Sequence, residues 1–106
     1  VQAGADGILI HSKSKSADEV MLFCKLFREF NHSIPIVVVP STYSHITASE
    51  LEKAGVNVII YANHLLRSSY PAMTKVAESI LENSSSKEAE QDCMPIKEII
   101  NLIPSS

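Results

Sequence analysis

The chain has 106 residues, which suits one modest domain, and 45% hydrophobic residues with only three glycines favour a packed core over disorder. Its formal net charge is −3 and its lysines are scattered, so we expect no nucleic-acid partner. No apolar run approaches the ~20 residues that a bilayer-spanning helix needs, so we expect no membrane partner.

The two cysteines, Cys24 and Cys93, show no metal-ligand or disulfide spacing. No CxxC or Cys/His pattern surrounds either one, so the sequence indicates neither a zinc site nor a disulfide framework. Cys24 falls on the apolar side of a predicted helix and is expected in the core. This cysteine usage favours a reducing, cytoplasmic setting.

The chain opens on VQAGAD, which is typical of the end of a helix. Gly4 is expected just past that end, in the left-handed conformation that glycine tolerates. The sequence shows neither an initiator Met nor a signal peptide. We therefore interpret the chain as the carboxy-terminal piece of a longer protein.

Three apolar runs have the length and β-branched content of strands, at residues 7–11, 34–40 and 56–62. None of the runs alternates cleanly between apolar and polar residues. Continuous apolar runs are typical of strands that are buried on both faces, as in a parallel sheet covered by helices. The sequence thus predicts a parallel sheet.

Two helical patterns separate the three strands. The first is preceded by Ser16 with Glu19 three positions later, which is the spacing of a capping box. Thr47 and Glu50 repeat this spacing before a short helix that ends at Gly55. The apolar stripe of the first helix consists of Val20, Phe23, Cys24, Phe27 and Phe30.

A longer helical pattern, from residue 65 to about 82, follows the third strand, with Pro71 near its first turn or bending it. Residues 83–92 are polar and low in complexity, which predicts a solvated linker. Pro95 suits the first position of a last amphipathic helix. The apolar face of that helix consists of Ile96, Ile99, Ile100 and Ile103.

Repeated strand–helix units fit two α/β architectures, an eightfold barrel and an open doubly wound sheet. In both architectures, functional groups collect at the carboxyl ends of the strands. The polar residues that follow the three predicted strands are His11, Ser12 and Lys13, then Ser41 and Thr42, then Asn63 and His64. The sequence therefore predicts one polar rim.

Three stretches carry a resemblance to a known family: AGADGILIHSKSKSADEV, IPIVVVPSTYSHITASELEKAG and VIIYANHLLRSSYPAM. In this order they resemble the carboxy-terminal part of the phosphoenolpyruvate mutase family, within the isocitrate lyase superfamily. The resemblance weakens at residues 84–91 and resumes at PIKEII. It implies that residues 1–82 are the last three strand–helix units of a (β/α)8 TIM-type barrel, 83–92 a polar linker and 93–106 a carboxy-terminal helix.

The resemblance also implies an isomerase that interconverts phosphoenolpyruvate and phosphonopyruvate, forming the P–C bond of phosphonate biosynthesis. His11 matches the family's active-site histidine, which binds the phosphoryl oxygens, so it is the candidate catalytic and substrate-binding residue. Asn63, in the matching Asn-His pair, and Ser12 are further candidates for substrate contact, and a helix-capping role for Asn63 is equally consistent. Mg²⁺ is the implied cofactor, but its ligands belong to earlier strands, and we assign no metal ligand in this sequence.

Three further expectations follow from the resemblance. Superfamily members exchange their eighth helix, so we expect a homo-oligomer, a dimer or tetramer, in which Met73, Val76 and Ile80 are buried against a neighbour. The intact protein would act on a small phosphonate or phosphate substrate, and these residues alone would be inactive. Two alternatives stay open: a phosphonopyruvate hydrolase or another C–C or P–C lyase of the superfamily, and a non-catalytic module that binds a phosphate ligand or a partner.

Overall fold

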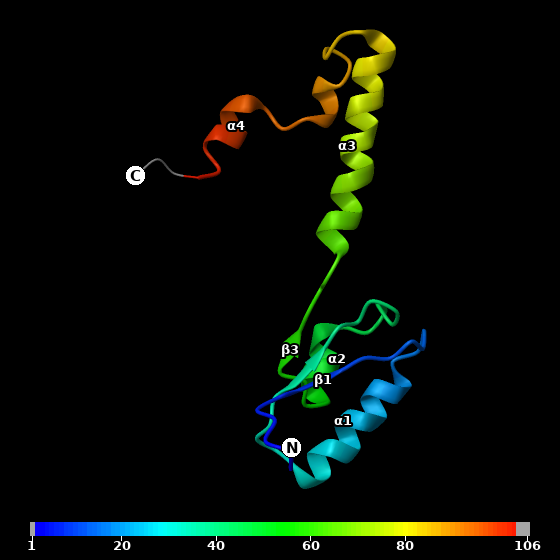
Figure 1. Ribbon diagram of the computed structural model, residues 1–106, viewed down its shortest axis with the longest axis vertical. Coiled ribbons are helices and arrows are strands. Elements are labelled where there is room, and N and C mark those ends of the chain that lie inside the picture. Colours follow the sequence, from blue (N-terminus) through cyan, green and yellow to red (C-terminus); the bar gives the residue numbers. More distant parts are fainter. Residues whose placement is uncertain (1, 104–106) are drawn as a thin grey trace. The chain divides into compact units, whose positions relative to one another are not determined.

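The computed structural model describes residues 2–103 and divides into two compact units, one that ends at Ala62 and one that begins at Asn63. The first unit contains β1 (Ile8–Ile10), α1 (Asp18–Phe30), β2 (Ile36–Val38), α2 (Ala48–Lys53) and β3 (Val58–Ile59) (Figure 1). The second unit contains α3 (His64–Asn83), the 3₁₀ turn η1 (Glu90–Asp92) and α4 (Ile96–Ile100). Residues 1 and 104–106, which the sequence analysis included in the first and last segments, lie outside the described residues.

The three strands form one parallel sheet in the order β1-β2-β3, which confirms the predicted strand–helix alternation. Leu9 pairs with Val37, and Val37 pairs with Val58. Each strand is shorter than its apolar run. Around β2, Pro35 and Pro40 have no backbone N–H to donate to the ladder, so the regular pairing stays between them.

Helices pack against one face of this sheet, and the opposite face is partly exposed. Ile36 and Val38 of β2 are fully buried on the face where α1 and α2 pack. On the opposite face, Leu9 is 59% exposed and Val58 is 46% exposed. The expectation of strands buried on both faces is therefore wrong for the described residues, because both helices of this unit pack on one side of the sheet.

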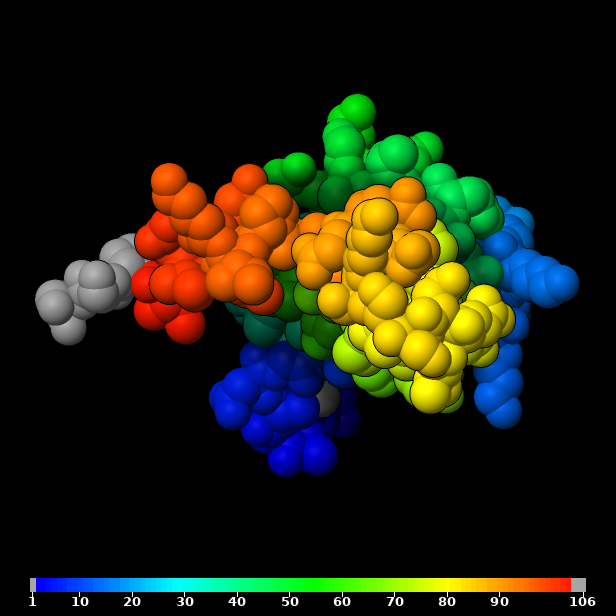
Figure 2. Space-filling view, turned by 90° about the horizontal axis from the view of Figure 1, so that it is seen from above, coloured from blue at the N-terminus to red at the C-terminus, as the bar shows by residue number. Residues whose placement is uncertain are grey.

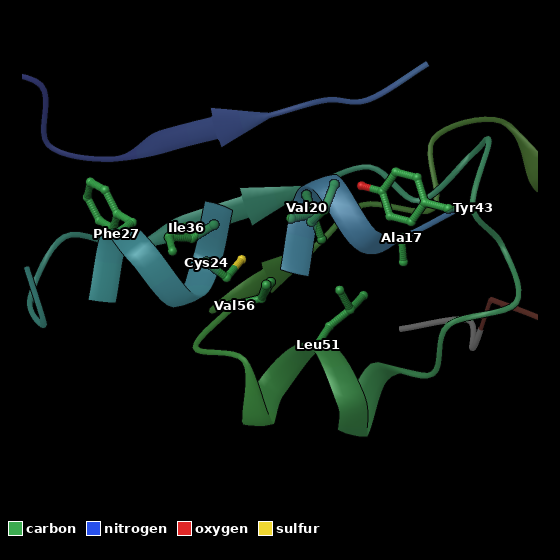
Figure 3. Close-up of a cluster of buried hydrophobic side chains, with 9 residues drawn as sticks. Ala17, Val20, Cys24, Phe27, Ile36, Tyr43, Leu51 and Val56 are labelled. Carbon is green, nitrogen blue, oxygen red and sulfur yellow. The ribbon is translucent and has the colours of Figure 1, made fainter. Parts of the chain in front are cut away.

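The core of the first unit lies between the sheet, α1 and α2 (Figure 3). Cys24 is fully buried there, as predicted, and Leu51 enters the cluster from α2. The stripe of α1 is only partly buried, because Phe30 is 72% exposed at the last position of the helix. The buried cluster consists of Ala17, Val20, Cys24, Phe27, Ile36, Val38, Tyr43, Leu51 and Val56.

Only one of the two predicted capping boxes forms. Thr47 caps α2, because its hydroxyl accepts from the Glu50 N–H while the Glu50 carboxylate accepts from the Thr47 N–H at 2.8 Å. The Thr47 N–H and the Thr47 hydroxyl both donate to the Glu50 carboxylate and lower the pKa of this carboxyl, the backbone N–H contributing most. The prediction for Ser16 and Glu19 is wrong: Ala17 is the N-cap of α1, with no side-chain cap.

Gly4 and Gly55 both adopt positive φ, at 91° and 93°, as expected for residues that follow a helix-like turn. At Gly55, both the positive φ and the nearby Arg28 side chain disfavour a residue with a Cβ atom. An added Cβ would lie 2.7 Å from the Nε atom of Arg28, which is closer than real Cβ contacts come. The short helix α2 therefore ends where predicted.

In the second unit, α3 has the predicted extent, contains Pro71 within it and buries none of its side chains. Figure 1 shows η1 beside α3, where Lys75 and Asp92 form an ion pair at 2.5 Å. Ala89, in the segment expected to be a solvated linker, is only 2% exposed. In Figure 2 the yellow end of α3 and the orange residues after it form one continuous surface.

Helix α4 is shorter than its apolar pattern, and Pro95 is its N-cap rather than its first residue. The predicted apolar face of this helix remains exposed, with Ile96 at 72% and Ile103 at 83%. No side chain of α4 is buried. The apolar side chains of α3 and α4 that the structure describes are thus largely exposed.

Candidate functional site

The loops that leave β1 and β2 meet at the carboxyl edge of the sheet. The Thr42 hydroxyl, after β2, donates a hydrogen bond of 2.8 Å to the carbonyl oxygen of Ser12, after β1. Parallel strands bring these two ends to the same edge, and the hydrogen bond joins them. The predicted meeting of the first two strand ends is therefore confirmed.

Ser12 is held inside the protein at this edge. Its side chain is buried, and its hydroxyl donates to the Glu19 carboxylate at 2.5 Å. The same hydroxyl oxygen accepts the backbone N–H of Ser14 at 3.0 Å. The polar atoms of this side chain are thus already engaged by the loop and by the first turn of α1.

His11 lies beside Ser12 and is exposed. No hydrogen bond or ion pair joins its ring to another residue within 2–103, so its ring nitrogens are available to a ligand. Together with Ser12, Glu19 and Phe23, His11 borders a shallow hollow of about 240 Å³.

Asn63 belongs to the second unit, whereas His11 and Ser12 belong to the first. Asn63 is the N-cap residue of α3, but its side chain makes no capping hydrogen bond. Its carbonyl oxygen accepts the Arg67 N–H at 2.9 Å, as the first intrahelical bond of α3. Asn63 therefore occupies the N-cap position of α3, but its side-chain amide does not cap the helix.

Tyr43 is a residue of this edge that the sequence did not single out. Its side chain is fully buried in the core, and its hydroxyl has no hydrogen-bond partner among the described residues. Burial raises the pKa of the Tyr43 phenol, and the nearby Cys24 raises it further. Burial also raises the pKa of the Cys24 thiol, which fits a core cysteine rather than a nucleophile.

Arg28 was also missed, and it organises the opposite, amino-terminal edge of the sheet. Its guanidinium donates to the carbonyl oxygens of Gly55 at 2.6 Å and Ile34 at 2.8 Å. It also donates to Asn57, whose side-chain oxygen accepts the Ile36 N–H as well. A planar fork of donors suits such a cluster of oxygens, and lone arginines give no sequence pattern that would have revealed it.

Between residues 2 and 103, no group of three or more His, Cys, Asp and Glu side chains is arranged to hold a metal ion. Mg²⁺ prefers carboxylate and other oxygen ligands. Glu19 is the carboxylate that borders the hollow at His11, and it already accepts the Ser12 hydroxyl. The described residues therefore do not fit a Mg²⁺ site, and we derive no step through a metal from them.

The fold and this edge define a parallel α/β protein whose polar groups gather at the carboxyl ends of its strands. Neither α3 nor any other helix within the described part of the chain combines the length and apolar content that crossing a membrane requires.

Comparison with known proteins assigns this chain to a family. Residues 1–81 match the family described as phosphoenolpyruvate phosphomutase. Over 100 residues, 94% of this chain, it is 36% identical to the phosphoenolpyruvate phosphomutase of Tetrahymena pyriformis, of which it covers 32%. The chain belongs to the phosphoenolpyruvate phosphomutase family.

Solved structures agree with this assignment. The crystal structure of a phosphoenolpyruvate phosphomutase from Streptomyces platensis subsp. rosaceus is 39% identical and superposes with a TM-score of 0.84, covering 95% of this chain and 34% of that one. A phosphonopyruvate hydrolase in complex with oxalate and Mg²⁺ is 33% identical, with a TM-score of 0.79, covering 95% of this chain and 35% of that one. The chain thus spans about a third of the length of the relatives it matches.

Proposed function

We propose that this chain is the carboxy-terminal part of a phosphoenolpyruvate mutase, which interconverts phosphoenolpyruvate and phosphonopyruvate. Family membership supports this activity. The main structural observation in its favour is that His11 lies exposed at the carboxyl end of β1, where its ring has no partner among the described residues. In this proposal residues 1–82 are the last three strand–helix units of a (β/α)8 barrel. Residues 83–92 then link them to a carboxy-terminal segment, 93–106.

The unequal faces of the sheet support the barrel. In such a barrel the helices lie outside, and inward side chains fill the interior in layers. Leu9 and Val58 lie in register on the face without helices, where they would join that interior. β1 and β3 are also edge strands among the described residues, and further strands would pair with them.

The proposed reaction moves a phosphoryl group within one molecule. The bond between phosphorus and the enol oxygen of phosphoenolpyruvate breaks, and a bond between phosphorus and the methylene carbon forms; the reverse regenerates phosphoenolpyruvate. The transferring group must be held in place while the pyruvate enolate turns its carbon toward it. A ring N–H of His11 would donate to the phosphoryl oxygens and stabilise their charge during transfer.

Asn63 and Ser12 remain the further candidates for substrate contact. Asn63 is proposed because it lies between the end of β3 at Ile59 and the start of α3, and its amide makes no capping bond. For Ser12, the contacts of its hydroxyl with Glu19 and Ser14 favour contact through the loop backbone.

We further propose that the intact protein uses Mg²⁺, as the related hydrolase structure contains Mg²⁺ and oxalate. When bound, such an ion supplies charge stabilisation to the enolate oxygens. Its ligands would come from outside these 106 residues, since the described ones do not form a carboxylate cluster.

A homo-oligomer formed by exchange of α3 is part of the same proposal. This helix buries none of its side chains, and Met73 is 61% exposed on its apolar side. Burial of Met73, Val76 and Ile80 against a neighbouring barrel would remove this surface from water. Sedimentation of the intact protein tests this part: a monomer at micromolar concentration would contradict it.

Phosphonopyruvate hydrolysis is the second candidate, because the hydrolase structure superposes almost as well as the mutase structure. The two activities differ in the acceptor of the phosphoryl group, which is the enolate oxygen in the mutase and water in the hydrolase. Phosphorus NMR of the intact protein with phosphonopyruvate and Mg²⁺ separates them. We expect a phosphoenolpyruvate signal; inorganic phosphate alone would establish the hydrolase, and no change would favour a binding module.

A further inference from the structure

We propose that Thr42 and Glu19 are positioning residues for His11, and that they act through Ser12. This inference rests on the proposed function, in which His11 binds the transferring phosphoryl group. Neither residue needs to touch the substrate in this account. Their part is to hold the loop from which His11 projects.

Ser12 is the centre of the arrangement because both of its polar groups are bonded to other segments. Its hydroxyl donates to Glu19, at the start of α1, at 2.5 Å. Its carbonyl oxygen accepts the hydroxyl hydrogen of Thr42, in the loop after β2, at 2.8 Å. Ser12 is also the buried polar residue of the described chain, at 6% exposure. The loop after β1 is therefore fixed from two sides immediately after His11.

The direction of the His11 side chain depends on this anchoring. The ring is exposed and has no hydrogen bond to any residue of the described part, so no second group holds it. β1 ends at Ile10, so the ladder of the sheet does not extend to His11. The Cα–Cβ direction of His11 is then set by the backbone on either side, one end of which is Ser12. A donor displaced by an ångström loses much of its effect on a transition state.

The contacts of Glu19 at the start of α1 agree with this arrangement. Glu19 stands three residues after Ser16, where it would ordinarily bond the backbone at the start of the helix. Instead Ala17 is the N-cap without a side-chain bond, and the carboxylate of Glu19 accepts the Ser12 hydroxyl. The first turn of a helix is a favourable place for a carboxylate, and a carboxylate oxygen is a strong acceptor for a hydroxyl such as that of Ser12. Glu19 thus contacts the loop after β1 instead of capping α1.

Substitutions at Thr42 in the intact protein provide the first test. Thr42→Val keeps the shape but removes the donor to Ser12. We expect kcat to fall about tenfold with KM little changed, which is less than the ~10²-fold cost of a 1 Å misplacement because Glu19 still holds Ser12. Thr42→Ser keeps a hydroxyl and should restore most of that loss. The matched control is Thr74→Val in α3, which removes a hydroxyl that donates to the Tyr70 carbonyl at 3.0 Å. We expect no change in kcat for this control.

Substitutions at Glu19 test the other side of Ser12. Glu19→Ala removes the acceptor and should lower kcat to a similar extent, whereas Glu19→Gln retains an amide oxygen that can accept the Ser12 hydroxyl. Melting temperatures measured on the same samples separate misfolding from mispositioning. If Glu19→Gln is as impaired as Glu19→Ala while both remain folded, or if Thr42→Val has wild-type kcat, the inference is wrong.

Combination with His11→Ala decides between positioning and a merely structural role. If Thr42 acts through His11, Thr42→Val should lower kcat no further once His11 is replaced by alanine. A further tenfold loss in the double variant would overturn the inference but leave His11 in the reaction. Wild-type turnover of His11→Ala alone would instead contradict the proposed function of His11, and the positioning inference would fall with it.

Discussion

The two units of this chain differ in how their apolar side chains are used. Before Ala62, α1, α2 and the sheet enclose a shared cluster in which Leu51 and Cys24 are fully buried. After Asn63, the 20-residue helix α3 buries no side chain, although it carries an apolar face. Burial of apolar area is the main stabilising contribution to folding. The first unit therefore contains its own core, whereas the apolar face of α3 in the second unit is left largely exposed.

Polar contacts differ in the same way. Arg28 in the first unit links α1 to the loops before β2 and β3 through several carbonyl oxygens. In the second unit, the ion pair of Lys75 with Asp92 lies on the surface, where such pairs contribute little. We therefore expect a substitution in the first unit to lower the free energy of unfolding more than a substitution of the same residue type in the second unit.

The largest difference is expected for leucine in the two units. Leu51→Ala removes a fully buried side chain and should lower the free energy of unfolding by about 2–5 kcal/mol, since it leaves a cavity. Leu81→Ala, at a leucine of α3 that is 78% exposed, should change it by less than about 0.5 kcal/mol. Urea unfolding of both variants measures the contrast. Equal losses would show that α3 is as well packed as the core.

Arginine gives the next contrast. Arg28→Ala leaves the carbonyl oxygens of Gly55 and Ile34 without their donor, and should lower the free energy of unfolding by about 2 kcal/mol. Arg28→Lys should recover only part of this, because an ammonium cannot reproduce the planar fork. Arg67→Ala is the control, since the Arg67 side chain has no hydrogen bond or ion pair within residues 2–103. A loss at Arg67 as large as at Arg28 would contradict the comparison.

Threonine hydroxyls provide a smaller contrast. Thr47→Ala removes the side chain that caps α2 and should lower the free energy of unfolding by about 1 kcal/mol. Thr74→Ala, inside α3, should be neutral or slightly stabilising, because alanine has the higher helix propensity. Thermal melting of the two variants tests this. A neutral Thr47→Ala would show that the capping box does not stabilise the folded protein.

The smallest effect concerns pH. The pKa of Glu50 is lowered from its ordinary value of 4.5 by the Thr47 N–H and hydroxyl. A carboxyl with a lowered pKa in the folded state stabilises the protein fully above its unfolded value and loses this contribution as the pH falls through the lowered value. The advantage of the wild type over Glu50→Gln should thus shrink below about pH 4.5. An advantage that grows on acidification would show the opposite sign.

The sequence predicted the parallel sheet and the alternation of its strands with helices because β-branched runs and helical spacing act locally. It also predicted the cap of α2 and the end of this helix at Gly55. Both depend on neighbouring backbone atoms, so the pattern of residue types was sufficient. His11 was recognised through the family resemblance, and the structure adds its exposure and the contacts of the loop beside it.

Other features depend on atoms that meet only in the folded chain. The cap of α1 was mispredicted because Ser12 competes for Glu19 from seven residues away. Tyr43 and Arg28 were missed because an isolated residue shows neither its burial nor the distant carbonyl oxygens that it reaches. The expectation of burial on both faces of the sheet was wrong because α1 and α2 pack on the same face, which the residue types along a strand do not reveal.

The central claim is that His11 acts on the transferring phosphoryl group, and steady-state kinetics of the intact protein test it most directly. His11→Ala should lower kcat for phosphonopyruvate about 10²-fold, the scale of one lost oriented donor, with an unchanged melting temperature. His32→Ala, an exposed histidine between α1 and β2, should keep wild-type turnover. Wild-type turnover in a folded His11→Ala variant, or an equal loss in His32→Ala, would contradict the account.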